Sequence, residues 1–186
     1  APLPEGMIMG QGGPFIPYHP DMHQPAETTS QEQELDMRID RWEQLRDVVA
    51  TIPLMAPIEG GYVSSRFGRR KDPITKAWAM HNGLDLGGVH RTSVRSTAPG
   101  TVVFAGRRAY YGRVIDVQHE NGLKTRYAHL YRINVKRGKK VGLGEEIGLL
   151  GSSGRSTGPH VHYEIRHLGK ALNPQKFLRA TKNVQQ

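Results

Sequence analysis

The sequence predicts a mainly β protein, in which an extended N-terminal arm and one helix precede a compact antiparallel β-sandwich or barrel-like domain. The first indication is composition: 22 glycines and 12 prolines among 186 residues, with only 7% aromatic residues, favour short strands joined by many turns over a helical bundle. The second is the change after Pro57 to short strand-like stretches separated by glycines. The third is Asn121-Gly122, a dipeptide typical of a β-hairpin. A chain of this length can hold one domain together with an arm.

The first 29 residues predict the arm. Residues 1–29 are rich in proline, glycine and methionine and show neither helical nor strand periodicity, which is typical of an extended or partly disordered segment. Because the chain begins at Ala1 and not at a methionine, we expect an exported protein from which a leader has been removed, or a shortened chain.

A helix is expected over residues 30–52, and it could be the end of a coiled coil. Ser30 followed by Gln33 resembles a capping box, and Pro53 ends the pattern. Apolar residues recur between these points at spacings of three and four, which places them on one helix face: Leu35, Ile39, Trp42, Leu45, Val49 and Ile52. Two interpretations are open, a helix packed on the domain and the tail of a longer coiled coil.

The β domain is expected over residues 53–180, with a short tail at 181–186. Asn121-Gly122 would join a strand near 113–119 to one near 123–129. Further strands are expected near 62–67, 101–105, 146–150 and 160–166, with the intervening glycines as turns.

Charge and composition exclude several classes of function. The absence of cysteine excludes disulfide scaffolds, cysteine nucleophiles and thiolate metal sites. No run reaches the ~18 to 20 apolar residues of a membrane span. The net charge of +9 divides into −6 for residues 1–52 and +15 for residues 53–186, so the domain would be attracted to a polyanion. Because the sequence holds no nucleic-acid-binding motif, we expect an anionic cell-wall or membrane surface and no nucleic acid.

Histidines and carboxylates occur in two patterns that suit a metal site. His81 and Asp85 are four residues apart around Gly83, which disfavours a helix. In the stretch 160–166, strand alternation would point His160 and His162 to the same side as Glu164 and Arg166. Catalytic zinc typically takes three protein ligands, and His81, Asp85 and one of the two neighbouring histidines supply that number. The other histidine, with His129, would be free for proton transfer or oxyanion stabilisation.

The order of these motifs resembles the LytM/lysostaphin-type zinc metallopeptidases, in particular their proteobacterial members. The resemblance covers roughly residues 57–178 and rests on these segments: His81-Asn-Gly-Leu-Asp85, Tyr127-Ala-His129-Leu130, Gly158-Pro-His160-Val-His162-Tyr-Glu164, Ser65-Arg-Phe-Gly-Arg-Arg70, Ala98-Pro-Gly100 and Asn173-Pro174. It implies a domain of the duplicated hybrid motif type. It also implies that one Zn²⁺ is held by His81, Asp85 and His162.

The resemblance further implies peptidoglycan as the substrate and zinc-assisted attack of water on a peptide cross-link, most closely the D-alanyl-diaminopimelate bond. His129 and His160 would flank the attacking water and the scissile carbonyl, stabilise the oxyanion and pass a proton to the leaving amine. Tyr127 and Asn82 are expected to contact substrate. We accordingly expect an envelope or periplasmic enzyme connected with cell division, with possible regulatory protein partners bound through the N-terminal helix.

Two alternative functions, a possible inhibitory role of the arm and the remaining histidines complete the expectations. A non-catalytic LytM-type module that binds the wall and activates other hydrolases would generally lack some ligands, and none is missing here. The stretches 98–106 and 141–151 resemble parts of biotinyl and lipoyl carrier domains or of sugar phosphotransferase subunits. A carrier would need a lysine at a hairpin tip, and Asn121-Gly122 offers none, whereas a phosphocarrier would not need His81 and Asp85. His19 and His23 could bring the acidic arm over the open zinc position as an inhibitor. The other histidines, expected at the surface, are His90, His119 and His167.

Overall fold

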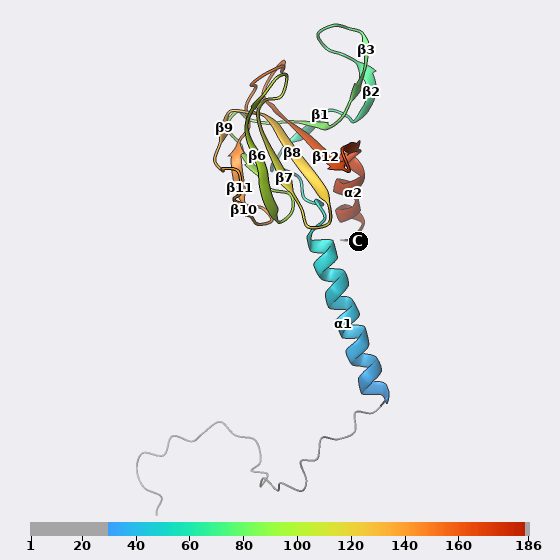
Figure 1. Ribbon diagram of the computed structural model, residues 1–186. Coiled ribbons are helices and arrows are strands. Elements are labelled where there is room, and N and C mark those ends of the chain that lie inside the picture. The colour runs from blue at the N-terminus through green and yellow to red at the C-terminus, as the bar shows by residue number, and fades with distance from the viewer. Residues whose placement is uncertain (1–29, 185–186) are drawn as a thin grey trace, which may run out of the picture. The chain divides into compact units, whose positions relative to one another are not determined.

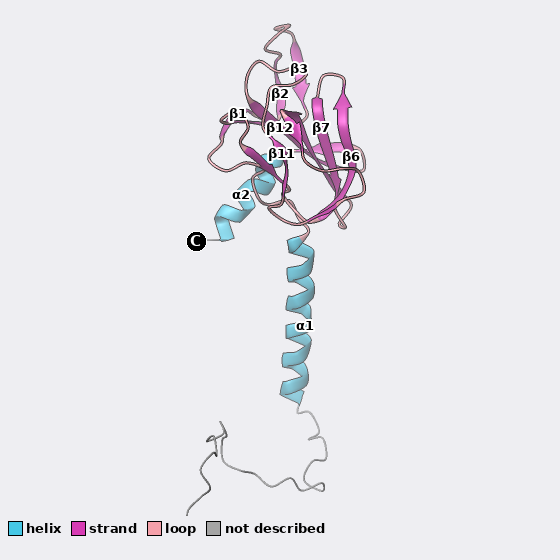
Figure 2. Cartoon of the chain, turned by 90° about the vertical axis from the view of Figure 1, so that its left-hand side faces the viewer, coloured by secondary structure: helices cyan, strands magenta, loops and turns pink. Residues whose placement is uncertain are grey.

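A computed structural model describes residues 30–184 of the chain, so the expected arm and the last two residues lie outside the described residues. The chain divides into two units, residues 1–42 and 43–186. Figure 1 and Figure 2 show that the second unit is built of strands, with helix in its first and last segments.

Helix α1 extends over Ser30–Ala50, close to the predicted 30–52. None of its residues is buried, and Leu35, Ile39 and Trp42 are 56%, 47% and 69% exposed. Whether this apolar face packs on the domain or on another helix stays a prediction. No helix in the described part of the chain is long and apolar enough to cross a bilayer.

The strands of the domain agree with the predicted mainly β class, and every strand pair is antiparallel. The strands are β1 Tyr62–Ser65, β2 Gly68–Lys71, β3 Trp78–His81, β4 Leu84–Gly87, β5 Ser93–Arg95, β6 Gly100–Arg108, β7 Gly112–Gln118, β8 Leu123–Leu130, β9 Arg132–Ile133, β10 Lys140–Val141, β11 Glu146–Leu149, β12 His160–His167 and β13 Lys170–Leu172.

One large sheet carries the domain. Its order is β1-β4-β12-β8-β7-β6-β10, with β13 paired to β12, and a second sheet has the order β5-β11-β9. The long strands β6, β7, β8 and β12 lie side by side in Figure 1. Strand β12 is therefore central, between β4 and β8, which places its side chains far from any sheet edge.

The core lies against one face of this sheet. Alternate residues of β12, namely Val161, Tyr163 and Ile165, are fully buried and pack with Leu84 of β4. The smaller sheet adds Ile147 and other residues to the same cluster. Burying apolar area at about 25 cal/mol per Å² is the main stabilisation of such a domain. The predicted alternation of β12 is therefore confirmed, since its polar residues are left on the opposite face.

Several elements were not predicted from the sequence, namely the short strands β2, β3, β4, β5, β9, β10 and β13 and the helix α2. Strands β2 and β3 form a separate two-stranded sheet beside the large one. Helix α2, Pro174–Val184, begins with proline at its first position and is capped by Asn173 Oδ1, which accepts a hydrogen bond of 3.0 Å from Gln175 N. Phe177 and Leu178 of α2 pack against the core, so residues 174–180 close the domain as a helix.

Candidate metal centre

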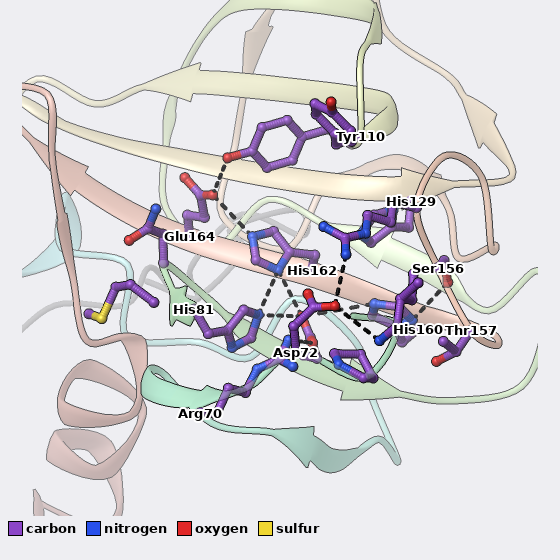
Figure 3. Close-up of a pocket in the computed structure, with 17 residues that line it drawn as sticks. Arg70, Asp72, His81, Tyr110, His129, Ser156, Thr157, His160, His162 and Glu164 are labelled. Carbon is purple, nitrogen blue, oxygen red and sulfur yellow. Dashed lines mark hydrogen bonds and ion pairs between the residues drawn. The ribbon is translucent and has the colours of Figure 1, made fainter. Parts of the chain in front are cut away.

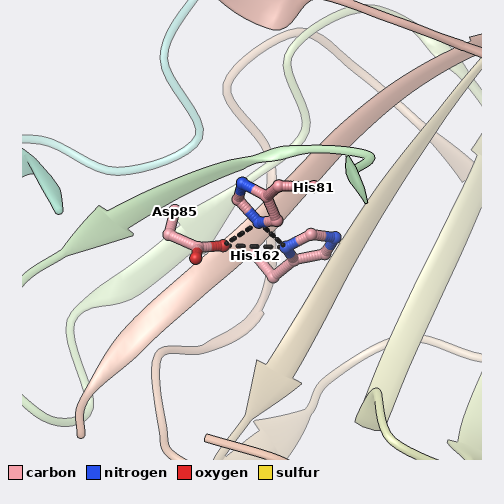
Figure 4. Close-up of side chains that lie close together, drawn as sticks. All are labelled: His81, Asp85 and His162. Atoms are coloured by element: carbon pink, nitrogen blue, oxygen red, sulfur yellow. Dashed lines mark hydrogen bonds and ion pairs between the residues drawn. The ribbon is translucent and has the colours of Figure 1, made fainter. Parts of the chain in front are cut away.

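Three side chains from three strands meet at one point. His81 ends β3, Asp85 lies in β4 and His162 lies in β12, where it is the direct register partner of Asp85. His81 Nε2 lies 3.1 Å from Asp85 Oδ1 and 3.1 Å from His162 Nδ1, and His162 Nδ1 lies 2.7 Å from Asp85 Oδ1 (Figure 4). The structure thus brings together the three expected ligands, all of them buried.

Gly83 is what lets these strands approach. A Cβ at this position would lie 2.6 Å from His162 Cε1 and 2.7 Å from the carbonyl oxygen of Tyr163. Such separations are far inside van der Waals contact, so any larger residue would displace His162. The turn between the two ligand-bearing strands therefore requires glycine for space.

The hydrogen bonds on the far sides of the two rings fix their tautomers. His81 Nδ1 lies 2.8 Å from the carbonyl oxygen of Arg66, which can only accept, so Nδ1 carries the proton. His162 Nε2 lies 3.0 Å from Glu164 Oε1 and donates to that carboxylate in the same way. In the neutral form of each ring, the facing nitrogens, His81 Nε2 and His162 Nδ1, are therefore left with lone pairs directed at Asp85.

When both rings are neutral, three acceptors converge here, which is the donor set of a cation site. Burial opposes ionisation of Asp85, but hydrogen bonds and charge from the protonated forms of His162 and His81 outweigh it and hold its pKa well below the ordinary value. Ligands about 2.0 to 2.2 Å from a tetrahedral zinc are separated by roughly 3.3 Å, close to the separations here. Among residues 30–184, His81, Asp85 and His162 are the group whose ligand atoms gather closely enough to share an ion. The residues fit Zn²⁺.

A second pair of imidazoles lies beside this centre. The rings of His129 and His160 are 4.8 Å apart between centroids, and His160 Nε2 lies 3.9 Å from Asp85 Oδ1. His129 Nδ1 donates to the carbonyl oxygen of Ser153 at 2.7 Å, and His160 Nδ1 donates to that of Gly158 at 2.8 Å. In the neutral form of each ring, Nε2 is therefore the nitrogen without a proton, and both residues line the cavity.

His129 is neutral at neutral pH. Burial lowers its pKa to about 4, an effect that the nearby His160 and His162 reinforce and the Ser153 carbonyl partly offsets. Its backbone φ is 60°, in the left-handed region that a histidine rarely adopts. Simple alternation along β8 would place His129 on the core face with Tyr127; the left-handed residue breaks that alternation and allows the ring to line the cavity instead.

A buried ionic layer supports the ligands from behind. Glu164 is fully buried and accepts hydrogen bonds from Tyr111 Oη at 2.8 Å and Arg166 at 2.6 Å, besides its contact with His162. Burial opposes its ionisation, yet these donors and the charge on His162 lower the pKa of Glu164 to about 2. Arg126, bound in turn to Asp116 through two hydrogen bonds of 2.7 and 2.9 Å, lies 3.6 Å from the same carboxylate. The strand alternation placed Glu164 on the polar face, but no sequence pattern indicated its partners.

The site opens into a cavity of about 230 Å³. Residues of the β2–β3 hairpin and the segment 155–157 both line it (Figure 3), and an ion pair of 2.8 Å between Asp72 and Arg155 joins the two segments. Asn82, expected to contact substrate, is exposed and lines this cavity. Its contact with substrate stays a prediction.

Two expectations need correction. Tyr127 has no exposed surface, and its hydroxyl is held by Thr97 and Thr125 in the core; it offers no atom to a substrate because its side chain points to the core face of β8. His119 was expected at the surface but is only 2% exposed, between the carbonyl oxygen of Pro99 and the hydroxyl of Thr125. His90 and His167 are exposed as expected.

Comparison with known proteins agrees with a zinc peptidase site. The chain is 46% identical over 112 residues to the DD-carboxypeptidase/endopeptidase Mpg of Neisseria meningitidis, which covers 60% of this chain and 26% of that relative. It is 44% identical over 115 residues to the peptidoglycan DD-endopeptidase ShyA of Vibrio cholerae, covering 61% of this chain and 27% of the relative. A solved zinc-containing peptidase from Vibrio cholerae superposes with a TM-score of 0.59 at 35% identity, over 63% of this chain and 37% of that one.

The chain spans about a quarter of the length of the curated relatives it matches. Residues 79–174 match peptidase family M23, and this range holds all three ligands together with both cavity histidines. The metallopeptidases of this family use zinc, and the donor set described above fits that metal. The chain belongs to peptidase family M23, the LytM-type family that its motifs predict.

Proposed function

We propose that this chain is a zinc metalloendopeptidase that hydrolyses peptide cross-links of bacterial peptidoglycan, with the D-alanyl-diaminopimelate bond as its target. The observation that carries the proposal is the complete set of three converging ligands beside two imidazoles that leave Nε2 unprotonated. The names of the relatives, a DD-carboxypeptidase/endopeptidase and a peptidoglycan DD-endopeptidase, support the substrate. The charge of +15 over residues 53–186 suits an anionic wall.

Bound Zn²⁺ would supply Lewis acidity, which polarises the scissile carbonyl and lowers the pKa of water toward ~7. The side chains of the cavity do the rest. Nε2 of neutral His129 can accept the proton of the attacking water. The resulting imidazolium can donate a hydrogen bond to the oxyanion and then transfer that proton to the leaving amine as the C–N bond breaks. Nε2 of His160 is available for the same exchange. The carbonyls of Ser153 and Gly158 hold both rings in the orientation that this exchange needs.

The rival within the family is a non-catalytic module that binds the wall and activates other hydrolases. Such a module has no need of a donor set with fixed tautomers or of a buried carboxylate on His162. This chain has both. We therefore favour the catalytic function.

The substrate also sets the place of action. Peptidoglycan lies outside the cytoplasm, so we propose a periplasmic or envelope location and a role connected with cell division. The exposed apolar face of α1 supports its use in binding a regulatory partner. Inhibition by His19 and His23 of the arm concerns residues outside the described part of the chain and stays a prediction.

The test is mass spectrometry of purified cross-linked muropeptide dimers after incubation with the zinc-loaded chain. We expect monomers whose masses identify the D-alanyl-diaminopimelate bond, and intact dimers with the His81→Ala variant. A folded, zinc-loaded chain that leaves the dimers whole would contradict the proposal. Monomers of other masses would correct the bond.

A further inference from the structure

Arg70 is a cation of the cavity whose hydrogen-bonding capacity is largely unused. It lies in β2, lines the cavity and keeps 31% of its side chain exposed. Its nearest carboxylate oxygen is Asp85 Oδ2, at 3.7 Å from its terminal nitrogen, which is beyond a hydrogen bond. In the described residues, Arg70 Nε is the one buried side-chain nitrogen or oxygen without a hydrogen-bond partner.

The other arginine that lines the cavity is already engaged. Arg155 donates to Asp72 Oδ1 at 2.8 Å. Asp72 in turn accepts hydrogen bonds from the backbone nitrogens of Ile74 and Thr75. Asp72 therefore balances the charge of Arg155 and weakens its attraction for an incoming anion, whereas Arg70 has no carboxylate within hydrogen-bonding distance and its planar fork is suited to one.

The position of Arg70 relative to the metal centre limits which anion it can meet. Asp85 separates the two: its Oδ1 faces His81 and His162, and its Oδ2 faces Arg70. Figure 3 shows Arg70 beside His81 and Asp72, while His129 and His160 lie on the other side of the centre. An anion bound by Arg70 would thus be separated from the metal centre by the carboxylate of Asp85 and would lie on the side away from the imidazole pair.

We propose that Arg70 binds the free carboxylate that stands next to the scissile nitrogen of the substrate. The proposal rests on the function proposed above. In a D-alanyl-diaminopimelate cross-link the carbon that carries the scissile nitrogen also carries a carboxylate, and the terminal residue of a D-alanyl-D-alanine stem has the same feature. One arginine would therefore select bonds to a residue with a free α-carboxylate and reject ordinary internal peptide bonds.

The experiment uses the zinc-loaded chain and two muropeptide dimers that differ in this carboxylate, free in one and amidated in the other. We expect the wild type to cleave the free acid with a kcat/KM about 10- to 100-fold higher, the range of one charge-assisted interaction. Arg70→Gln should lower kcat/KM for the free acid by about the same factor and leave the amide unaffected, so that the preference disappears. Its zinc content should equal that of the wild type.

The matched control is Arg69→Gln. Arg69 neighbours Arg70 but its guanidinium stacks on the ring of Trp78 at 4.6 Å, and it does not line the cavity. This variant should keep the wild-type preference. Two results would overturn the role of Arg70. One is equal cleavage of both dimers by the wild type; the other is an Arg70→Gln variant that loses the same fraction of activity on both dimers and also loses zinc. Cleavage of neither dimer by the wild type would instead remove the proposed function on which it rests.

Discussion

Glu164 Oε1 lies 3.0 Å from Nε2 of His162, on the opposite side of the ring from the Nδ1 that faces Asp85. The carboxylate fixes the tautomer and the plane of the imidazole before any ion binds. Because Glu164 is fully buried, its charge is balanced by hydrogen bonds and ion pairs and not by water. The metal centre therefore depends on a residue that would not touch the metal.

Replacing Glu164 by glutamine should weaken zinc binding. Glutamine keeps the size and one acceptor oxygen but removes the charge that raises the basicity of His162, so we expect about a 10- to 100-fold loss of zinc affinity. Competition with a chromophoric chelator measures it. Glu145→Gln is the control, since Glu145 pairs with Lys139 away from the cavity. Equal affinities in the two variants would mean that Glu164 does not tune the ligand.

The ligands could be predicted from sequence because each lies in a short local pattern. His160 and His162 lie in a strand whose apolar residues alternate strictly, so strand alternation alone predicts that both lie on the polar face. Asp85 was found through its spacing from His81 and through the resemblance to a family. The choice of His162 over His160 came from the resemblance alone; in the structure it follows from the register with Asp85 and the bond to Glu164.

The supporting residues could not be predicted in the same way, because their partners are distant in sequence. Asp116 and Arg126 meet Glu164 only through the pairing of β7, β8 and β12. The polar stretch Gly68–Lys71 carries no alternation, so the β2–β3 hairpin gave no strand signal. The Asn121-Gly122 hairpin was predicted at the right place, but its loop is longer than the expected two residues and holds residues 119–122. Within it Gly122 has a positive φ of 77°, whereas Asn121 does not.

The two groups of histidines should separate in experiment. His81→Ala removes a ligand and should abolish zinc binding and hydrolysis together. His129→Asn should keep zinc, because Asn tolerates a positive φ and can still donate to Ser153, yet it should lower kcat about 10²- to 10⁴-fold through the loss of Nε2. Zinc content by atomic absorption and rates on muropeptide dimers check both. Normal cleavage by His129→Asn would exclude its role in proton transfer.

Gly83→Ala should disturb the centre by overpacking. The new methyl group would meet His162 at 2.6 Å, and forced movement of a packed side chain costs about 1 to 3 kcal/mol. We expect lower thermal stability together with weaker zinc binding. Gly142→Ala is the matched control, because a Cβ there meets nothing within 4 Å and the backbone φ is not positive. Unchanged zinc affinity in Gly83→Ala would show that the turn between β3 and β4 can move away from β12 without cost to the site.

Acidification should destabilise the domain in part through His119, which lies outside the metal centre. Burial lowers the pKa of His119, and its Nδ1 proton is already given to the carbonyl oxygen of Pro99, so protonation would have to occur on the Nε2 that faces Thr125. The unfolded chain, with a histidine pKa near ~6.5, then binds more protons than the folded one as the pH falls below that value. The free energy of unfolding must therefore decrease on acidification and stop changing below the folded pKa.

His119→Asn keeps a donor for Pro99 but cannot titrate. Urea denaturation of the zinc-loaded proteins from pH 7.5 to 5 should give a shallower pH dependence for the variant than for the wild type. Parallel curves would mean that His119 keeps its ordinary pKa in the folded domain.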